Sequence, residues 1–271
     1  MNGSNPLVSV LVPCLNEQDN IENCVDQIAK TFRAAGIPFE VLVINDGSTD
    51  NTLGRAQSLS TSRSYVRVVD LGDNFGKTVA LKEGARRASG DLVAFFDADL
   101  QYSPKDLVTM ITRLEDGIDF VNGNRDYNGY GASRTAFSRL YNRVVRLLFR
   151  MEIRDSNCGV KVLRRKTVDA DTMFTYGLPL LVPLLKIRGF ESTEVPVALH
   201  ERKSGESKYF QDGRFLGGTR NVRDIVFHTI MLLSLLVHAP FEWSRKTTSH
   251  EKGQSLAILH STGAINKNHQ T

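Results

Sequence analysis

Two carboxylates stand one residue apart at the end of an apolar run, in the sequence FFDADLQYSP at residues 95–104. Asp97 and Asp99 lie at positions i and i+2, so on a continuing strand both side chains point to one side and can converge on one ion. Gln101 continues this series with an amide oxygen. Hard oxygen ligands suit Mg²⁺ or Mn²⁺, which usually keep waters and share the phosphates of a substrate. The same pattern also fits a solvated strand end before a helix, and the motif alone leaves both interpretations open.

Two further polar clusters follow apolar runs. In VLVINDGSTDNT, Asp46 could accept hydrogen bonds from a nucleobase or a ribose, and Gly47 permits close approach of a ligand to the backbone. In VPCLNEQDN, Pro13 ends the run and Glu17 faces the same side of the molecule. Each cluster alone also fits an ordinary turn with a helix cap. The absence of GxGxxG after the first run disfavours a dinucleotide site.

Short β-branched runs alternate with helical patterns through about the first 125 residues, as in α/β proteins. Strands are expected over 7–13, 39–46, 65–71 and 91–99, and helices over 16–35 with Asn16 as a cap, after Ser48, over 77–88 and from Ser103-Pro104. This alternation predicts right-handed βαβ units in a doubly wound, mostly parallel sheet with helices on both faces. Ligands of such sheets bind beyond the carboxyl ends of the strands, and the three polar clusters fall there.

Composition is ordinary for a globular domain, with 41% hydrophobic residues, 24% charged residues and a formal net charge of +4. The small net charge gives no indication of a nucleic-acid partner. Cys14, Cys24 and Cys158 have neither an even number nor metal-ligand spacing, which favours a reducing compartment. The first apolar run ends at Pro13, too early for a signal peptide, so we expect a cytoplasmic domain.

The pattern is less regular beyond residue 125. We expect a helix over 133–150, a strand over 158–165, an apolar helix over 178–189 interrupted by Pro183, a strand over 193–199 and a polar loop over 200–209. The expected organisation is a globular domain over 1–215, an amphipathic or juxtamembrane helical segment over 216–246 and a disordered tail over 247–271.

Two segments bear on membrane association. The helix expected over 133–150 carries Arg139, Arg143, Arg146 and Arg150 as one basic stripe beside apolar side chains. Such a helix suits an anionic membrane surface, or equally the solvated face of a packed helix. The apolar stretch 225–237 would be about 20 Å long as a helix, against roughly 30 Å of bilayer hydrocarbon. It therefore fits an interfacial or partner-covered helix, or a helix that closes the core of the domain itself.

Taken in order, VSVLVPCLNE, VLVINDGSTDNT, LGDNFGKTVALKEGARRASGD and FFDADLQYSP resemble the family 2 glycosyltransferases of the GT-A fold over about residues 1–215. The elements DADLQ, DSNCGVKVLRR and RKSGESKY resemble the polyprenyl-phosphate branch, which includes dolichyl-phosphate mannose synthases and bactoprenol glucosyltransferases. This resemblance implies an inverting, metal-dependent transfer of a hexose from a UDP- or GDP-sugar to a dolichyl or undecaprenyl phosphate. The expected location is the cytoplasmic face of a membrane.

The resemblance also implies roles for individual residues. The nucleotide sugar would be bound by Pro13, Glu17, Asp46, Lys77, Asp97, Ala98 and Asp99. The Mg²⁺ or Mn²⁺ ion would be held by Asp97, Asp99 and Gln101. The acceptor phosphate or the donor diphosphate would meet Arg125, Arg202, Ser207 and Lys208. Asp97, Asp99 and Arg125 are the expected catalytic residues.

Two positions depart from the mannose synthase pattern. Asn45 stands where those enzymes usually have a second aspartate, which favours a UDP-sugar, and YGLPLLVP replaces polar residues that related enzymes tend to carry on the acceptor side. An ionised acceptor phosphate, whose second pKa is about 6, needs no strong general base, which fits the lack of a histidine motif. Two other functions stay open: a glycosyltransferase with a glycan or protein acceptor, and a non-catalytic subunit that binds nucleotide sugar or lipid phosphate. For the polyprenyl-phosphate transferase, the expected partners also include a membrane protein or a second copy of the chain.

Overall fold

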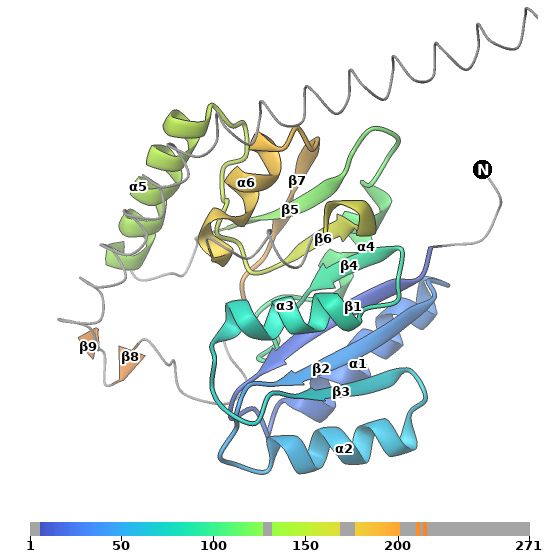
Figure 1. The fold of residues 1–271 in the computed structure, drawn as a ribbon. Helices are drawn as coiled ribbons and strands as arrows, with labels where there is room; N and C mark the ends of the chain where they lie inside the picture. Colours follow the sequence, from blue (N-terminus) through green and yellow to red (C-terminus); the bar gives the residue numbers. More distant parts are fainter. Residues whose placement is uncertain (1–5, 127–131, 169–176, 201–209, 212–213, 216–271) are drawn as a thin grey trace, which may run out of the picture. The chain divides into compact units, whose positions relative to one another are not determined.

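The computed structural model describes residues 6–126, 132–168, 177–200, 210–211 and 214–215, all within one compact unit that spans residues 1–221 (Figure 1). The segments expected over 216–246 and 247–271, including the apolar stretch 225–237, lie outside the described residues. Within the described part of the chain, no helix is both long enough and apolar enough to cross a bilayer.

A seven-stranded sheet forms the centre of this unit, in the order β3-β2-β1-β4-β6-β5-β7. The strands are β1 (Val8–Cys14), β2 (Phe39–Asn45), β3 (Val66–Asp70), β4 (Leu92–Phe95), β5 (Phe120–Arg125), β6 (Lys161–Arg164) and β7 (Ser192–Val197). Only β6 runs antiparallel to its neighbours β4 and β5 in this sheet. The mostly parallel sheet predicted from the sequence is therefore confirmed. A separate antiparallel pair joins β8 (Phe210–Gln211) to β9 (Arg214–Phe215).

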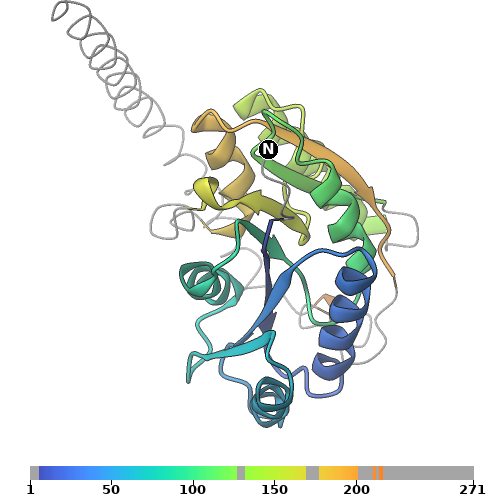
Figure 2. The same ribbon diagram turned by 90° about the vertical axis from the view of Figure 1, so that its right-hand side faces the viewer.

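Helices cover both faces of the sheet (Figure 2). One face packs against α1 (Ile21–Ala34), α2 (Thr52–Ser62) and α4 (Pro104–Thr112), and the other against α3 (Lys77–Arg87), α5 (Ala132–Phe149) and α6 (Leu181–Ile187). Strand side chains alternate between these two cores, so Val10 and Val12 face α1 while Leu11 faces α3. Burial on both sides explains why the strands are apolar at nearly every position.

Helix α1 begins later than the sequence predicted. The prediction began it at residue 16 with Asn16 as the cap, whereas the helix begins at Ile21 after Asn20. Asn16 has a left-handed backbone with φ of 54°, a conformation that asparagine tolerates better than most residues. Its side-chain oxygen accepts a hydrogen bond from the Thr49 backbone N–H at 2.8 Å. A contact with the next loop, rather than the helix, therefore decides the conformation of Asn16.

Two other elements differ from the pattern. Pro183 does not interrupt the apolar helix, because α6 begins at Leu181 after a 3₁₀ turn (Leu178–Leu180) and proline is tolerated in a first turn. Strand β5 was not predicted. The start of α4 was predicted correctly, with Pro104 in its first turn. The Ser103 hydroxyl accepts a hydrogen bond from the Lys105 backbone N–H, and the Ser103 backbone N–H donates to the Asp106 carboxylate.

Candidate active site

The loops after β1 and β2 form one hydrogen-bonded unit at the carboxyl edge of the sheet. The backbone N–H of Glu17 donates to the Thr52 hydroxyl at 2.8 Å, and the backbone N–H of Asn51 donates to the Gln18 side chain at 2.9 Å. The carboxylate of Glu17 accepts a bond from the Asn20 amide at 2.8 Å. Pro13, the last residue but one of β1, pairs in register with Ile44 of β2. The structure therefore brings the first two predicted clusters together.

Asp46 fixes the loop between β3 and α3. Its buried carboxylate accepts hydrogen bonds from the backbone N–H groups of Phe75 at 2.8 Å and Gly76 at 3.0 Å. The adjacent Gly47 has φ of +68°, and a Cβ at this position would lie 2.4 Å from the carbonyl carbon of Asp73. The pair thus holds residues 73–76 against the turn after β2. The sequence predicted that Asp46 contacts the nucleoside, and in the structure its carboxylate positions this loop.

The turn after β4 carries the paired carboxylates. The Oδ1 atom of Asp97 lies 2.5 Å from the ammonium nitrogen of Lys77, the first residue of α3. Ala98 is buried, and Asp99, only 8% exposed, accepts a bond from the Gln101 backbone N–H at 3.2 Å. Leu100 adopts a left-handed backbone with φ of 53°, which closes the turn. The turn therefore holds Asp97, Asp99 and Gln101 in one short segment beside a cationic side chain.

The pKa of the buried Cys24 thiol is sensitive to the negative charge of the nearby carboxylates. Burial raises its pKa, and the carboxylates of Asp99, Asp97 and Glu17 raise it further because they oppose a thiolate. Cys24 is thus an inert core residue rather than a nucleophile, and the three carboxylates act on the same place. Their concentration creates a region that attracts cations.

Because Gly159 has no side chain, the Asp97 carboxylate can lie beside its backbone. A Cβ at position 159 would lie 2.8 Å from Oδ2 of Asp97, closer than real Cβ contacts allow. Gly159 precedes β6, the antiparallel strand inserted beside β4, so its position depends on the topology of the sheet. No role was predicted for this glycine, although it lies within the DSNCG segment.

The oxygen atoms of the turn fit a divalent cation that the protein binds together with a phosphate ligand. Among residues 6–200 for which the structure describes side chains, no group of three or more His, Cys, Asp or Glu side chains could hold a metal ion. Asp97, Asp99 and Gln101 supply two carboxylates and an amide oxygen, which suits Mg²⁺ or Mn²⁺ with water and phosphate completing the coordination. The ammonium group that pairs with Asp97 indicates that this carboxylate accepts a cation.

A polar cavity lies at the end of β5. Its volume is about 340 Å³, and all its charged lining residues are arginines; the lining consists of Asn124, Arg125, Arg139, Asn142, Arg143, Arg146 and Arg154. Three of the arginines come from the predicted basic stripe of α5. We call this cavity the arginine pocket. Guanidinium groups in this number favour a phosphate or carboxylate ligand.

A buried ion pair orients Arg125 in the arginine pocket. Its Nε and Nη2 atoms donate to the two carboxylate oxygens of Asp155 at 2.6 and 2.8 Å, and the Asn142 amide donates to Asp155 at 3.1 Å. Burial alone would raise the pKa of Asp155, but the bonds from Arg125 outweigh it and hold the pKa below its usual value. Asp155 was not among the predicted site residues.

The family model for glycosyl transferase family 2 matches residues 9–175, more than half of the chain. The chain belongs to this family. Its predicted membership is thereby confirmed, and the motifs of the three strand ends lie within the matched region.

Solved structures support the GT-A fold of this glycosyltransferase. Glucosyl-3-phosphoglycerate synthase from Mycobacterium tuberculosis, in complex with Mn²⁺, UDP-glucose and phosphoglyceric acid, has a TM-score of 0.61 at 20% identity, covering 84% of this chain and 80% of that chain. The same enzyme in complex with UDP has a TM-score of 0.60 at 20% identity, covering 85% and 80%. At this identity the likeness shows the fold alone.

The segment that follows β7 is hydrogen-bonded to the turn after β4. The backbone N–H of His200 donates to the Gln101 carbonyl at 2.8 Å. The segment after β7 therefore contacts the turn that carries the paired carboxylates. Arg202, Ser207 and Lys208 lie outside the described residues, so their assigned roles stay predictions.

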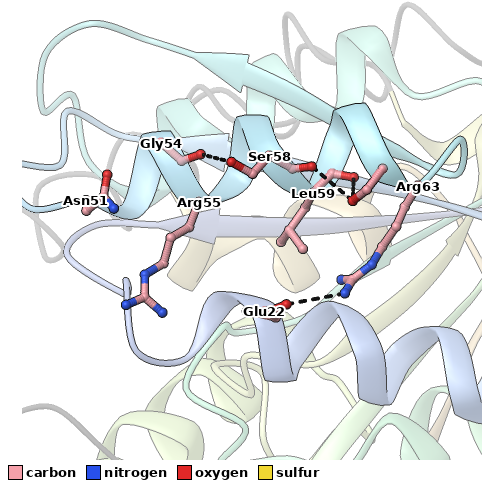
Figure 3. Close-up of a pocket in the computed structure, with 8 residues that line it drawn as sticks. Glu22, Asn51, Gly54, Arg55, Ser58, Leu59 and Arg63 are labelled. Carbon is pink, nitrogen blue, oxygen red and sulfur yellow. Dashed lines mark hydrogen bonds and ion pairs between the residues drawn. The ribbon is translucent and has the colours of Figure 1, made fainter.

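A larger cavity of about 410 Å³ lies in the glycosyltransferase between α2 and the start of α1 (Figure 3). It is lined by Glu22, Asn51, Gly54, Arg55, Ser58, Leu59, Ser62 and Arg63. Arg55 extends from α2 toward the start of α1, while Arg63 pairs with Glu22 at 3.5 Å. None of the predicted site residues lines this cavity.

Proposed function

We propose that this glycosyltransferase moves a hexose from a nucleotide sugar to a polyprenyl phosphate, with Mg²⁺ or Mn²⁺ held by Asp97, Asp99 and Gln101. The observation that carries the acceptor is the arginine pocket, which α5 borders, together with the exposed apolar side chains of the same helix. Leu140 and Leu147 are 61% and 72% exposed, and Val144 and Leu148 are also exposed. A phosphate attached to a long hydrocarbon chain would match both features.

The same helix supports a location at a membrane surface. Arg139, Arg143 and Arg146 on α5, and Arg150 directly after it, are exposed near the leucines of this helix. Basic and apolar side chains on one helix bind anionic lipid surfaces by combining charge attraction with burial of apolar area. We infer peripheral association with the cytoplasmic face, where a lipid-linked phosphate would be accessible.

The donor is a nucleotide sugar, and a UDP-sugar is favoured. Glucosyl-3-phosphoglycerate synthase, which has the same fold, has been solved with UDP-glucose and Mn²⁺. Asn45, the departure that favours UDP in the sequence, uses its amide to bond Asp70 at 2.8 Å and so joins the ends of β2 and β3. This bond supports the position of the turn that carries Asp46, a residue predicted to contact the nucleoside.

The proposed reaction is a single displacement with inversion. An oxygen of the acceptor phosphate forms a bond to the anomeric carbon while the bond from that carbon to the donor diphosphate breaks, and its electron pair leaves with the diphosphate. A bound divalent cation supplies charge stabilisation of that leaving group. Arg125 orients the acceptor phosphate, which is largely ionised at neutral pH because its second pKa is about 6. No residue has to remove a proton from the nucleophile.

A small phosphorylated acid is the second candidate acceptor. The arginine pocket would suit a phosphate and a carboxylate on one small molecule, and glucosyl-3-phosphoglycerate synthase has been solved with phosphoglyceric acid. The exposed apolar side chains of α5 would then have no part in acceptor binding. This difference makes the two acceptors distinguishable.

One panel of assays tests these proposals. The chain is incubated with UDP-glucose or GDP-mannose, with Mn²⁺, and with undecaprenyl phosphate, dolichyl phosphate or 3-phosphoglycerate. We expect labelled sugar in the lipid fraction, lost with EDTA and lost in Asp97→Ala and Asp99→Ala but retained in the exposed control Asp116→Ala. Transfer to 3-phosphoglycerate alone would favour the small acceptor. Transfer to a glycan or protein would indicate a different acceptor class, and nucleotide binding without any transfer would indicate a non-catalytic subunit.

The membrane location has a separate test. We expect the chain to sediment with vesicles that contain anionic lipid, and we expect binding to weaken with salt and in the double variant Leu140→Ser, Leu147→Ser. Purely soluble behaviour at low salt would contradict this part of the proposal.

A further inference from the structure

The ammonium group of Lys77 lies where a metal ion would approach Asp97. The Lys77 nitrogen and Asp97 Oδ1 are 2.5 Å apart, and the two side chains are 42% and 27% exposed. The pair joins the start of α3 to the turn after β4, two segments that meet only in the folded chain. The described structure therefore already has a cationic group at Asp97, the first of the paired carboxylates.

The other oxygen of Asp97 lies next to Gly159. Oδ2 faces Gly159, where an added Cβ would lie 2.8 Å from it and 3.5 Å from the ring of Tyr102. Lys77 thus occupies the Oδ1 side of the carboxylate, and Gly159 borders the Oδ2 side. Mg²⁺ binds oxygen ligands at about 2.0–2.1 Å, and an ammonium group at contact distance repels it. The ammonium group and a metal ion therefore compete for Oδ1.

The backbone just before Lys77 is held by contacts with the turn after β2. Asp46 accepts hydrogen bonds from Phe75 and Gly76, the two residues before Lys77. Gly47 packs against the backbone of residues 73–74. Lysine has a compact charge on a flexible four-carbon stem, so the ammonium can change partners while the start of α3 stays in place.

We propose that the ammonium group of Lys77 is a resident counter-ion of Asp97. A divalent cation displaces this ammonium group, which then binds the donor diphosphate. This inference rests on the proposed function, because it requires the cation site at Asp97, Asp99 and Gln101. The ammonium opposes binding of the metal alone and favours binding of the metal together with a diphosphate. Lys77 thereby strengthens the coupling between metal and nucleotide, since each ligand removes a cost from the binding of the other.

Substitutions of Lys77 should therefore have opposite effects on the two ligands. Without nucleotide, Lys77→Met should bind Mn²⁺ about two- to fivefold more tightly, the range expected when an exposed ion pair no longer competes. With Mn²⁺ present, the same variant should bind UDP about tenfold more weakly, because a charge-assisted bond to phosphate is lost. Lys77→Gln should repeat both effects, whereas Lys77→Arg, which keeps the charge, should oppose Mn²⁺ binding as the wild type does.

The measurement is a titration of the full chain with Mn²⁺, followed by the electron paramagnetic resonance of free Mn²⁺, with and without UDP. Lys30→Met is the matched control, because Lys30 is an exposed residue of α1 and the net charge changes equally. Circular dichroism and thermal unfolding establish that each variant is folded. Unchanged or weaker Mn²⁺ binding in folded Lys77→Met and Lys77→Gln, with Mn²⁺ and UDP binding intact in the wild type, would overturn this inference alone. If neither the wild type nor the variants bind Mn²⁺, with or without UDP, the proposed function fails as well.

Discussion

Replacement of Asp155 by asparagine should destabilise the fold and disorganise the arginine pocket at the same time. The Asp155 side chain is 1% exposed and that of Arg125 is 11% exposed. Asp155 accepts two bonds from the Arg125 guanidinium, a third from the Arg125 backbone N–H at 3.2 Å and a fourth from Asn142. Asparagine removes the negative charge and places an NH₂ group where one of these acceptors stood.

The expected cost follows from burial of the pair. Removal of one partner of a buried ion pair typically costs about 3–5 kcal/mol, because the other charge stays buried without compensation. Arg125 also lies among other arginines in the arginine pocket, which increases the repulsion it experiences. For a domain of this size the loss corresponds to a fall in the melting temperature of roughly 6–20 °C.

The pH dependence gives an independent check. Because the pKa of Asp155 is lowered in the folded chain, its contribution to stability is present above the ordinary carboxyl pKa and is lost as the pH falls through the folded pKa. The difference in unfolding free energy between wild type and Asp155→Asn should therefore be largest near neutral pH. It should narrow once the pH falls below about 4.

Urea unfolding at pH 7 and at lower pH measures both effects, with the exposed Asp116→Asn as the control. A loss of stability below about 1 kcal/mol at pH 7, the range of a surface ion pair, would refute the reasoning. At a temperature where the variant is folded, we also expect a raised KM for the acceptor and an unchanged affinity for UDP, because Arg125 loses its orientation.

Three further substitutions test other parts of the structure. Gly159→Ala should weaken Mn²⁺ binding, measured by titration, because its Cβ would displace the Asp97 carboxylate; an affinity equal to the wild type would contradict the close approach. Ser103→Ala should lower the unfolding free energy by about 1 kcal/mol through loss of the α4 cap, and no change in urea unfolding would argue against the capping box. Glu40→Gln should cost about 2 kcal/mol at pH 7, since burial raises the Glu40 pKa but bonds from Ser9 and its other partners outweigh this and lower it. That difference should shrink as the pH falls below 4.5, and a gap that is constant with pH would exclude the ionised form as the stabilising one.

Local sequence patterns were enough to predict the class of sheet, the family and the edge of the sheet at which the polar clusters lie. Apolar runs such as 39–45 can be buried on both faces only in a sheet covered by helices, and their period is a local property of the chain. The carboxyl ends of parallel strands meet at one edge, so polar residues after β1, β2 and β4 had to gather there. The capped start of α4 was predictable for the same reason, since Ser103, Pro104 and Asp106 act within one turn.

Contacts between residues far apart in the chain could be known only from the folded structure. The pairs Lys77–Asp97 and Arg125–Asp155 join residues 20 and 30 positions apart, and the position of Gly159 beside Asp97 depends on the insertion of β6 between β4 and β5. Asn16 lies outside α1, contrary to the prediction, and its side chain instead accepts a hydrogen bond from the loop after β2. Periodicity and turn preference describe neighbours along the chain, whereas these contacts depend on strand order and on the charges that folding brings together.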